Sequence, residues 1–289
     1  MTQIRIAIPN KGRMWEPSRQ ILERIGLGLE KVSDKSLFIK TNNPQIDVIA
    51  VRVEDIPEFV RDGAADLGIT GRDVIAERRV RVSELLPLNF GYCSLILAVP
   101  QKWETESVKQ LPDNLKIATK FPNVAKSYLK KNKKEAQLVI LSGAVEIAPI
   151  IGIADAVIDL TSTGTTLKTH GLRVIETILQ SQAVLIGDRE NLKKPEKRSL
   201  VDDIMLAIKG VVFAEKKKYL IINLPENKLP ELEGITEGLL SPTITKLDKK
   251  GWVAAQLVVE ENKIFNIIKK VKNIGGRDIL VVPIERLVR

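Results

Sequence analysis

Short apolar runs alternate with amphipathic segments through the first two thirds of the chain. Runs of four to eight mainly apolar residues predict buried strands, and apolar positions spaced three and four apart predict helices between them. The alternation favours an α/β class with mostly parallel sheets. We expect strands at residues 3–8, 46–51, 65–70, 81–88, 93–99, 116–120, 138–141, 156–160, 173–179 and 183–186, and helices ending near 25, 62 and 131.

The last third follows a different pattern. Residues 190–199 resemble a polar linker and 200–213 an amphipathic helix. Beyond them the predicted order is βαββαβ, the ferredoxin-like split unit. The elements are residues 219–224, 226–233, 243–247, 252–259, 262–272 and 279–284. This part contains no cluster of acid and base residues, so a regulatory or oligomerising role is favoured over catalysis.

The most informative segment runs from Asp155 to Leu167, where a buried strand gives way to five hydroxyl residues around Gly164. Thr165 to His170 is expected to form one helical turn. Backbone N–H groups, hydroxyls and a helix N-terminus suit a phosphate monoester. Asp159, just before this turn, could accept hydrogen bonds from sugar hydroxyls or hold a metal through water. We interpret the segment as a ribose-phosphate site; the alternative is an ordinary surface loop.

Two more glycine loops follow predicted strands. Lys11, Gly12 and Arg13 come after the first strand, and Gly71-Arg72-Asp73 after the strand at 65–70. Open α/β sheets bind ligands at the carboxyl ends of their strands, so the three loops predict one cleft. For the first loop a solvated basic turn remains the alternative.

Composition limits the chemistry. A length of 289 residues allows two or three domains, and the one cysteine and one histidine exclude a disulfide framework and a multi-histidine metal site. No apolar stretch approaches the ~20 residues of a membrane span, and no signal-peptide pattern precedes residue 9. We therefore expect a cytoplasmic protein without membrane contact.

The net charge of +9 raises the possibility of nucleic-acid binding. The lysines occur in separate runs, at 126–134, 193–198, 216–218 and 269–272, without zinc-finger spacing or interleaved aromatic residues. Solvated faces explain most of them, and no nucleic-acid partner is expected. A basic balance also suits an enzyme that attracts polyphosphate substrates.

Several motifs resemble one known family. They are residues 6–13, 65–73 and 141–149, then Glu146, Gly152, Asp159, Thr163-Gly164 and Thr166-Leu167, and in the tail residues 240–243, 251–254 and 279–286. The match covers nearly the whole chain and resembles long-form ATP phosphoribosyltransferase, the first enzyme of histidine biosynthesis. One departure is His170, where asparagine is common in the family.

The resemblance implies a transfer reaction. Adenine N1 of ATP attacks the anomeric carbon of phosphoribosyl pyrophosphate (PRPP), inverts it and releases pyrophosphate, giving N1-(5-phosphoribosyl)-ATP, with Mg²⁺ required. Such a reaction needs little proton transfer, so positioning and charge stabilisation can supply most of the rate.

The resemblance also implies site residues. Asp159 would bind the ribose and hold Mg²⁺ through water, and Glu146 would hold the hydrated Mg²⁺ or the ribose. Lys11, with Arg13, would bind the pyrophosphate or the ATP phosphates. Asp159, Glu146 and Lys11 are the catalytic candidates. The PRPP 5′-phosphate would bind to Thr161, Ser162, Thr163, Gly164, Thr165 and Thr166. ATP would contact Lys11, Gly12, Arg13, Gly71, Arg72 and Asp73.

The implied fold is a two-lobed body like the periplasmic binding proteins, plus a ferredoxin-like (ACT-like) domain. Residues 1–91 with 181–205 would form the first lobe, 92–180 the second, and 206–289 the regulatory domain. The last would bind histidine as feedback inhibitor, through Asn223, Leu239, Ser241, Thr243, Val258 and Asp278. AMP would be a second inhibitor, and the protein a hexamer exchanging with a dimer.

Two other classes compete with this interpretation. A non-catalytic two-lobed protein that senses a small anion or an amino acid would share the architecture. Such a receptor should carry an export signal, and a transcription regulator a helix-turn-helix; the sequence shows neither. A nucleic-acid-binding protein would lose affinity steeply with added salt.

Overall fold

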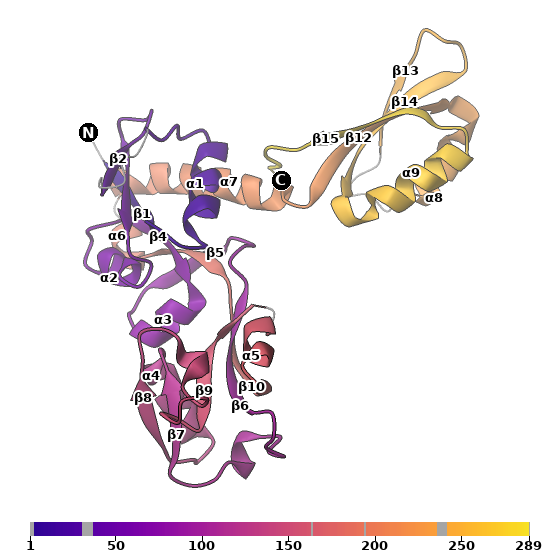
Figure 1. Cartoon of the computed structure of the whole chain (residues 1–289). Coiled ribbons are helices and arrows are strands. Elements are labelled where there is room, and N and C mark those ends of the chain that lie inside the picture. Colours follow the sequence, from indigo (N-terminus) through magenta and orange to yellow (C-terminus); the bar gives the residue numbers. More distant parts are fainter. Residues whose placement is uncertain (1–2, 31–36, 163, 194, 236–241, 289) are drawn as a thin grey trace. The chain divides into compact units, whose positions relative to one another are not determined.

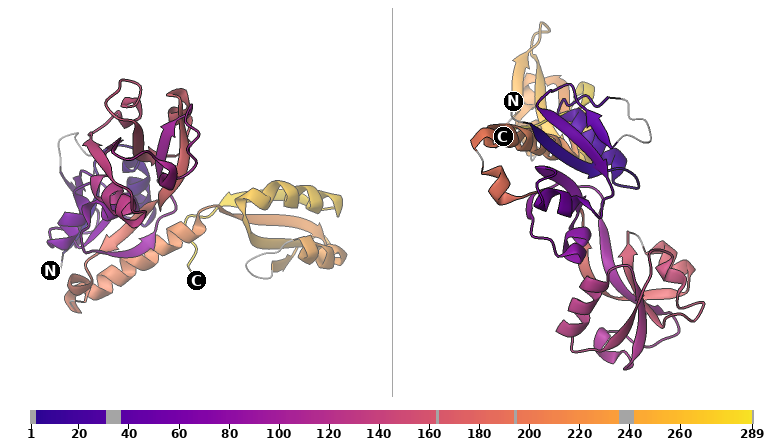
Figure 2. Two further views of the ribbon diagram at one scale, coloured as in Figure 1. Left: turned by 90° about the horizontal axis from the view of Figure 1, so that it is seen from below. Right: turned by 90° about the vertical axis from the view of Figure 1, so that its left-hand side faces the viewer.

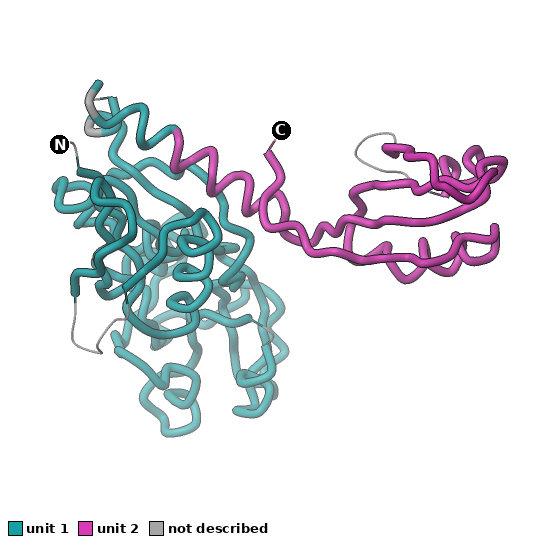
Figure 3. Tube along the Cα trace, turned by 90° about the horizontal axis from the view of Figure 1, so that it is seen from above, with its two compact units in different colours: residues 1–202 teal, residues 203–289 magenta. Residues whose placement is uncertain are grey.

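A computed structural model describes residues 3–30, 37–162, 164–193, 195–235 and 242–288. The chain divides into two compact units, residues 1–202 and residues 203–289 (Figure 3). The first unit holds two sheets and the second unit holds one. Thr163, Leu239 and Ser241, which the sequence places in binding sites, lie outside the described residues.

The first sheet is mixed. Its strand order is β2-β3-β1-β4-β11-β5, and β1 is parallel to both β3 and β4, whereas the other pairs are antiparallel. These strands are β1 (Ile4–Pro9), β2 (Phe38–Lys40), β3 (Ile46–Val51), β4 (Leu67–Gly71), β5 (Ser83–Pro87) and β11 (Ala183–Gly187). The helices α1 (Trp15–Arg24), α2 (Ile56–Arg61) and α3 (Arg72–Arg78) follow β1, β3 and β4. We call this part lobe I.

The second sheet has the order β10-β6-β9-β7-β8, and only β7 is parallel to its neighbours β8 and β9. Its strands are β6 (Cys93–Pro100), β7 (Leu115–Thr119), β8 (Ala136–Ile140), β9 (Ala156–Thr161) and β10 (Leu172–Ser181). The helices are α4 (Pro122–Lys131) and α5 (Thr165–Thr169), with single 3₁₀ turns at Val108–Gln110 and Val145–Ile147. We call this part lobe II.

The two lobes are joined where β5 leads into β6 and where β10 leads into β11 (Figures 1 and 2). Cys93 at the start of β6 is paired with Ser181 at the end of β10, so the two crossings lie side by side. The expected two-lobed body is confirmed. The expectation of mostly parallel sheets was wrong, because β11 returns from lobe II and runs antiparallel to both β4 and β5.

The second unit has the predicted βαββαβ order, with the sheet order β13-β14-β12-β15 and only antiparallel pairs. Its elements are β12 (Lys217–Pro225), α8 (Leu229–Ile235), β13 (Thr243–Lys246), β14 (Trp252–Glu260), α9 (Ile264–Asn273) and β15 (Arg277–Pro283). Leu220, Ile222 and Leu224 pack with Leu232 of α8 and Val271 of α9 into one core. Because strand side chains alternate, Tyr219, Ile221 and Asn223 lie on the opposite, helix-free face.

The predicted linker at 190–199 was wrong. Residues Arg189–Leu192 form α6, and the long helix α7 begins at Pro195 and runs to Ala214. Proline is well tolerated in a helix's first turn, where its missing N–H would have no partner. The ammonium of Lys197 lies 2.6 Å from Asp66 Oδ1, which is buried, and this pair fixes the start of the helix on lobe I.

The expected helix start at residues 143–149 is reduced to the 3₁₀ turn Val145–Ile147. Pro149 lacks the N–H that would bond to the carbonyl of Val145 in a continued α-helix, so the helix cannot extend. Glu146 is nevertheless held on this turn, as predicted.

Candidate active site

The hydroxyl-rich segment forms the predicted strand, turn and short helix. β9 ends at Thr161, and α5 begins at Thr165. The backbone N–H of Gly164 donates to Thr161 Oγ1 at 2.8 Å, which closes the turn. Gly164 has φ of +75°, a conformation that favours glycine, and no neighbouring atom lies within 4 Å of where a Cβ would be. Ser162, Thr165 and Thr166 are exposed to solvent.

The loop after β1 meets this segment across the two lobes. Arg13 Nη1 donates to Ser162 Oγ at 3.0 Å, although the two residues are 149 positions apart in the sequence. Two of the three predicted loops therefore converge in the folded chain. The guanidinium of Arg13 offers charged N–H donors, and the turn offers neutral hydroxyl donors. Both kinds of donor can bind phosphate oxygens.

A cavity of about 580 Å³ lies between the lobes, within the usual size range of small-molecule sites. It contains four of the predicted residues, Lys11, Gly12, Arg13 and Asp73. The other lining residues are Met14, Val53, Glu54, Glu58, Val74, Glu77, Arg78, Lys120, Phe121, Pro122, Asn123, Ile140 and Leu160. Lobe I thus lines this space with charges of both signs, and lobe II adds the positive charge of Lys120.

Asp73 lies in the first turn of α3, and its side chain is held in place by hydrogen bonds. Its side chain is buried, Ser181 Oγ donates to Asp73 Oδ1 at 2.5 Å, and the Asp73 N–H donates to Ser181 Oγ at 3.0 Å. A Cβ on Gly71 would lie 2.2 Å from Asp73 Oδ1, so only glycine at position 71 leaves room for this carboxylate.

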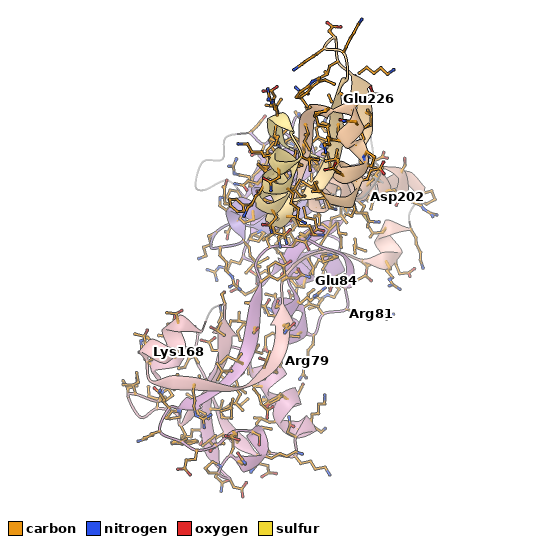
Figure 4. The ribbon with its side chains drawn as sticks, turned by 90° about the vertical axis from the view of Figure 1, so that its right-hand side faces the viewer. Arg79, Arg81, Glu84, Lys168, Asp202 and Glu226 are labelled. Carbon is orange, nitrogen blue, oxygen red and sulfur yellow. The ribbon has the colours of Figure 1, made fainter. Side chains whose placement is uncertain are left out.

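Arg72 and Gly71 do not line the cavity. The Arg72 guanidinium binds both carboxylate oxygens of Glu84, at 2.9 and 2.5 Å (Glu84 is labelled in Figure 4). This pairing also raises the pKa of Arg72. A direct contact between Arg72 and a nucleotide stays a prediction.

Asp159, Glu146 and Lys120 are electrostatic neighbours. Burial raises the pKa of Asp159, the negative charge of Glu146 raises it further, and the Leu160 N–H and Lys120 oppose this. The Leu160 N–H donates to Asp159 Oδ1 at 2.8 Å. The predicted pair of carboxylates is therefore close together, beside Leu160 and Lys120 of the cavity wall.

This arrangement limits how a metal could bind. Among the described residues no group of three or more histidine, cysteine, aspartate or glutamate side chains could hold a metal ion. Two neighbouring carboxylates fit Mg²⁺, which usually keeps several waters and takes other ligands from substrate phosphates.

Sequence reasoning missed Glu54, Glu58, Glu77 and Lys120. Two of them could have been found, because Glu54 lies just beyond β3 and Lys120 directly follows β7, where the carboxyl ends of strands meet ligands. Lys120 Nζ lies 3.1 Å from Glu54 Oε1, so the two join lobe II to lobe I. Glu77 sits on a helix and gave no such signal.

The basic run at 126–134 lies at the end of α4 and in the turn after it. Lysines are favoured at a helix C-terminus by its partial negative charge. Lys134 Nζ donates to the Leu111 carbonyl at 2.6 Å and pairs with Asp113 at 3.3 Å. Lys134 is therefore engaged in contacts within lobe II. Within the described part of the chain, no helix has the length and apolar character to span a membrane.

In the second unit, the described residues of the predicted histidine site are Asn223, Thr243, Val258 and Asp278. Asn223 Nδ2 donates to Asp278 Oδ2 at 3.4 Å. By strand register Thr243 is opposite Gln256 and Val258 is opposite Tyr219, so both lie on the helix-free face with Asn223.

This face has a neutral hydrogen-bond network that the sequence did not reveal. Tyr219 OH donates to Gln256 Oε1 at 2.6 Å, and Gln256 Nε2 donates to Thr245 Oγ1 at 3.5 Å. The available signal was the period of two expected for a strand, which places Tyr219 and Gln256 on the face away from the core.

Comparison with known proteins gives a consistent result. A family model for ATP phosphoribosyltransferase (HisG) matches residues 52–210, and one for the HisG C-terminal domain matches residues 214–286. The chain is 45% identical over 287 residues to the ATP phosphoribosyltransferase of Methanocaldococcus jannaschii, covering 98% of this chain and 99% of that one. It is 44% identical to that of Methanothermobacter thermautotrophicus, covering 99% of each.

A solved structure is similar as well. A chain of the ATP phosphoribosyl transferase (HisG:HisZ) complex from Thermotoga maritima is 28% identical, with a TM-score of 0.62, over 71% of this chain and 98% of that chain. With both family models matched in order and relatives alike over their full length, the chain belongs to the ATP phosphoribosyltransferase family, in the long form that carries the HisG C-terminal domain.

Proposed function

We propose that this enzyme transfers the phosphoribosyl group of PRPP to N1 of ATP in the cavity between lobes I and II. The hydrogen bond from Arg13 to Ser162 carries the proposal, because it brings a basic loop of one lobe to the phosphate-binding segment of the other. The rival idea of a non-catalytic sensor is not favoured, since the full-length relatives are phosphoribosyl-transferring enzymes.

The 5′-phosphate of PRPP binds to the turn between β9 and α5. Thr161, Ser162, Thr165 and Thr166 offer hydroxyls there, and Thr163 is assigned with them from the sequence. Gly164 lets the backbone approach the phosphate. Asp159 accepts hydrogen bonds from the ribose hydroxyls, which fits a carboxylate at the end of β9.

The departing pyrophosphate and the ATP phosphates meet Lys11 and Arg13 on lobe I. Positive charge that is already in place stabilises the charge that builds on the leaving group. Asp73, buried and fixed by Ser181, lies on the nucleotide's side of the cavity. Because N1 of adenine is itself the nucleophile, no side chain has to remove a proton before attack, and orientation of the two substrates supplies most of the rate.

Mg²⁺, when bound, neutralises the pyrophosphate group of PRPP. Glu146 and Asp159 would hold the hydrated ion, with further oxygen ligands coming from the substrate's phosphates. The raised pKa of Asp159 reflects a carboxylate whose charge is poorly solvated. A bound cation or a ribose hydroxyl would stabilise the negative charge of Asp159.

The second unit serves in regulation. Histidine, the end product of the pathway, binds on the helix-free face near Asn223, Thr243, Val258 and Asp278, with Leu239 and Ser241 assigned from the sequence alone. AMP shares the adenosine part of ATP and competes for the cavity in the first unit. We further propose a hexamer that exchanges with a dimer, and a cytoplasmic location, where ATP is available.

The test combines the protein with Mg²⁺, ATP and PRPP and follows the absorbance change of the modified adenine. Asp159→Asn should lower kcat/KM for PRPP about 100-fold, because a charged acceptor of hydrogen bonds is lost. Asp62→Asn, on an exposed turn of lobe I, is the matched control. Wild-type protein without turnover would refute the function, and an Asp159→Asn variant with unchanged kinetics would refute the assignment of Asp159.

A further inference from the structure

The end of α3 in lobe I contacts the start of α4 in lobe II. Glu77 Oε1 accepts a hydrogen bond from the N–H of Asn123 at 3.0 Å, and Glu77 Oε2 accepts one from the N–H of Val124 at 3.0 Å. Asn123 Nδ2 donates in turn to the Glu77 carbonyl at 3.0 Å. One carboxylate of lobe I thus binds the first free N–H groups of a lobe II helix.

α4 has no N-terminal cap of its own. Phe121 is in the capping position and provides no side-chain hydrogen bond, and Pro122 occupies the first turn. The first N–H groups of a helix need an acceptor, and the positive end of the helix favours a negative one. Lobe I supplies that acceptor through Glu77. The cap therefore exists only while the two lobes are together.

Arg79 adds a second connection. It ends α3 in the left-handed conformation, with φ of +55°, which is unfavourable for a residue other than glycine. From there its Nη2 donates to the Asn123 carbonyl at 2.8 Å and to Ser127 Oγ at 2.6 Å (Arg79 is labelled in Figure 4). We call these contacts of Glu77 and Arg79 with Asn123, Val124 and Ser127 the α3–α4 clamp.

The other contacts across the cavity are of a different kind. Arg13 with Ser162 and Glu54 with Lys120 also join the lobes. Arg13 and Ser162 are assigned to substrate phosphates, and Lys120 lies next to the ribose-binding Asp159, so substrates would take over these groups. The α3–α4 clamp uses no group assigned to a substrate and can persist when ligands enter.

We propose that Glu77 and Arg79 are positioning residues that hold lobe II against lobe I before substrates bind. The substrate-binding groups on the two lobes are then already at their working separation. The inference rests on the proposed function only for the identity of the substrates. The clamp itself is a property of the folded chain.

The consequence is specific to binding. Without the clamp the lobes open, and the apparent affinity falls in proportion to the fraction that remains closed. If a tenth stays closed, KM for ATP and for PRPP rises about 10-fold. Bound substrates bridge the lobes themselves, so kcat at saturation does not change. A simple folding defect would do the opposite, lowering kcat through loss of active protein at constant KM.

Two variants test this in the full-length enzyme. Glu77→Ala removes the cap. Arg79→Gly removes the guanidinium but suits the left-handed conformation, so it should not lower the unfolding midpoint. Asp62→Ala is the control, because the exposed Asp62 carboxylate pairs with its neighbour Arg61 and lies outside the clamp. A rise in KM of at least fivefold in both variants, with kcat within twofold of wild type, supports the proposal; any other pattern contradicts it.

Hydrogen exchange gives a readout that does not need activity. The amides of Asn123 and Val124 should exchange about 10-fold faster in Arg79→Gly, which keeps the Glu77 carboxylate that accepts their hydrogen bonds. ATP with PRPP should slow this exchange again by restoring the closed fraction. Unchanged exchange in Arg79→Gly refutes the clamp even if the enzyme is active. If wild-type protein shows no turnover, the proposed function fails, while accelerated exchange still establishes the clamp.

Discussion

The cavity of the first unit and the helix-free face of the second unit are built from different chemistry. The cavity brings together cations such as Lys11 and Lys120 and carboxylates such as Glu54 and Asp73, and Glu54 pairs with Lys120 across the two lobes. The face of the second unit carries a neutral network of tyrosine, glutamine and threonine and, apart from it, the hydrogen-bonded pair Asn223 and Asp278. Fixed charges suit a reaction in which pyrophosphate leaves, whereas neutral donors and one carboxylate suit recognition of a small zwitterion.

The two regions also differ in how they hold their carboxylates. Asp73 is buried, and its carboxylate packs so closely against Gly71 that a Cβ there would collide with it. Asp278, in contrast, lies on the edge strand β15. A change that displaces the first carboxylate should affect catalysis. A change that removes the charge of the second should affect inhibition alone.

The largest expected effect follows Gly71→Ala. The new methyl group would lie 2.2 Å from Asp73 Oδ1, so the carboxylate must move and lose its bond to Ser181. A misplacement of about 1 Å near reacting groups costs about 100-fold in kcat/KM. Steady-state kinetics with ATP and PRPP measure this effect.

Gly234→Ala, in α8 of the second unit, is the matched control, because nothing lies within 4 Å of its added methyl group. Its kcat/KM should equal that of wild type. If Gly71→Ala behaves like Gly234→Ala, Asp73 has no part in binding the nucleotide, and the contrast between the two regions disappears on this point.

The next effect concerns the second unit. Asp278 has φ of +48°, a conformation that asparagine tolerates well, so Asp278→Asn keeps the shape and removes the charge. A hydrogen bond to a charged group contributes about 1.5–3 kcal/mol, so the histidine concentration for half-inhibition should rise at least about 10-fold. The rate without histidine should stay the same.

Equilibrium dialysis with histidine separates binding from its effect on the rate. Asp113→Asn, an exposed aspartate of lobe II that pairs with Lys134, serves as the control. Equal histidine binding by wild type and Asp278→Asn would mean that this face does not hold the inhibitor's ammonium group.

Much of this organisation was predictable from local sequence. The strand at 46–51, the turn around Gly164 and the βαββαβ order of the second unit match the structure, because each depends on residues close together in the chain. The direction of β11 and the helical start of α7 were not predictable in that way. Lys197, near the start of α7, pairs with Asp66, which is 131 positions away, so nothing in the local sequence indicates this contact.

The candidate site shows the same limit. Lys11, Arg13 and Ser162 stood out because glycine turns follow their strands, and the structure brings Arg13 and Ser162 together. Glu77 was missed because its role depends on the unfilled cap of α4, a helix of the other lobe. Partners supplied by a distant lobe leave no local pattern.

The smallest expected effect is on the free energy of unfolding and concerns Asp159, a carboxylate of the first site. Burial, with the charge of Glu146, raises the pKa of Asp159 above its ordinary value. The folded state therefore favours the protonated carboxyl. Its contribution to stability is present below the ordinary pKa of about 3.9 and is lost as the pH rises through the raised value. At pH 7.5 the charged carboxylate destabilises the fold, so Asp159→Asn should increase the free energy of unfolding by about 0.5–1 kcal/mol while activity falls.

Urea unfolding at pH 7.5 and near pH 4 measures this difference, which should shrink at the lower pH as the wild-type carboxyl takes up its proton. Asp62→Asn is the control of opposite sign, because its hydrogen bond to Arg61 lowers the pKa of Asp62, and it should gain no stability at pH 7.5. A gain for Asp159→Asn that is the same at both pH values would mean that the substitution acts through packing. No gain at either pH would mean that the charge of Asp159 is fully compensated without a ligand.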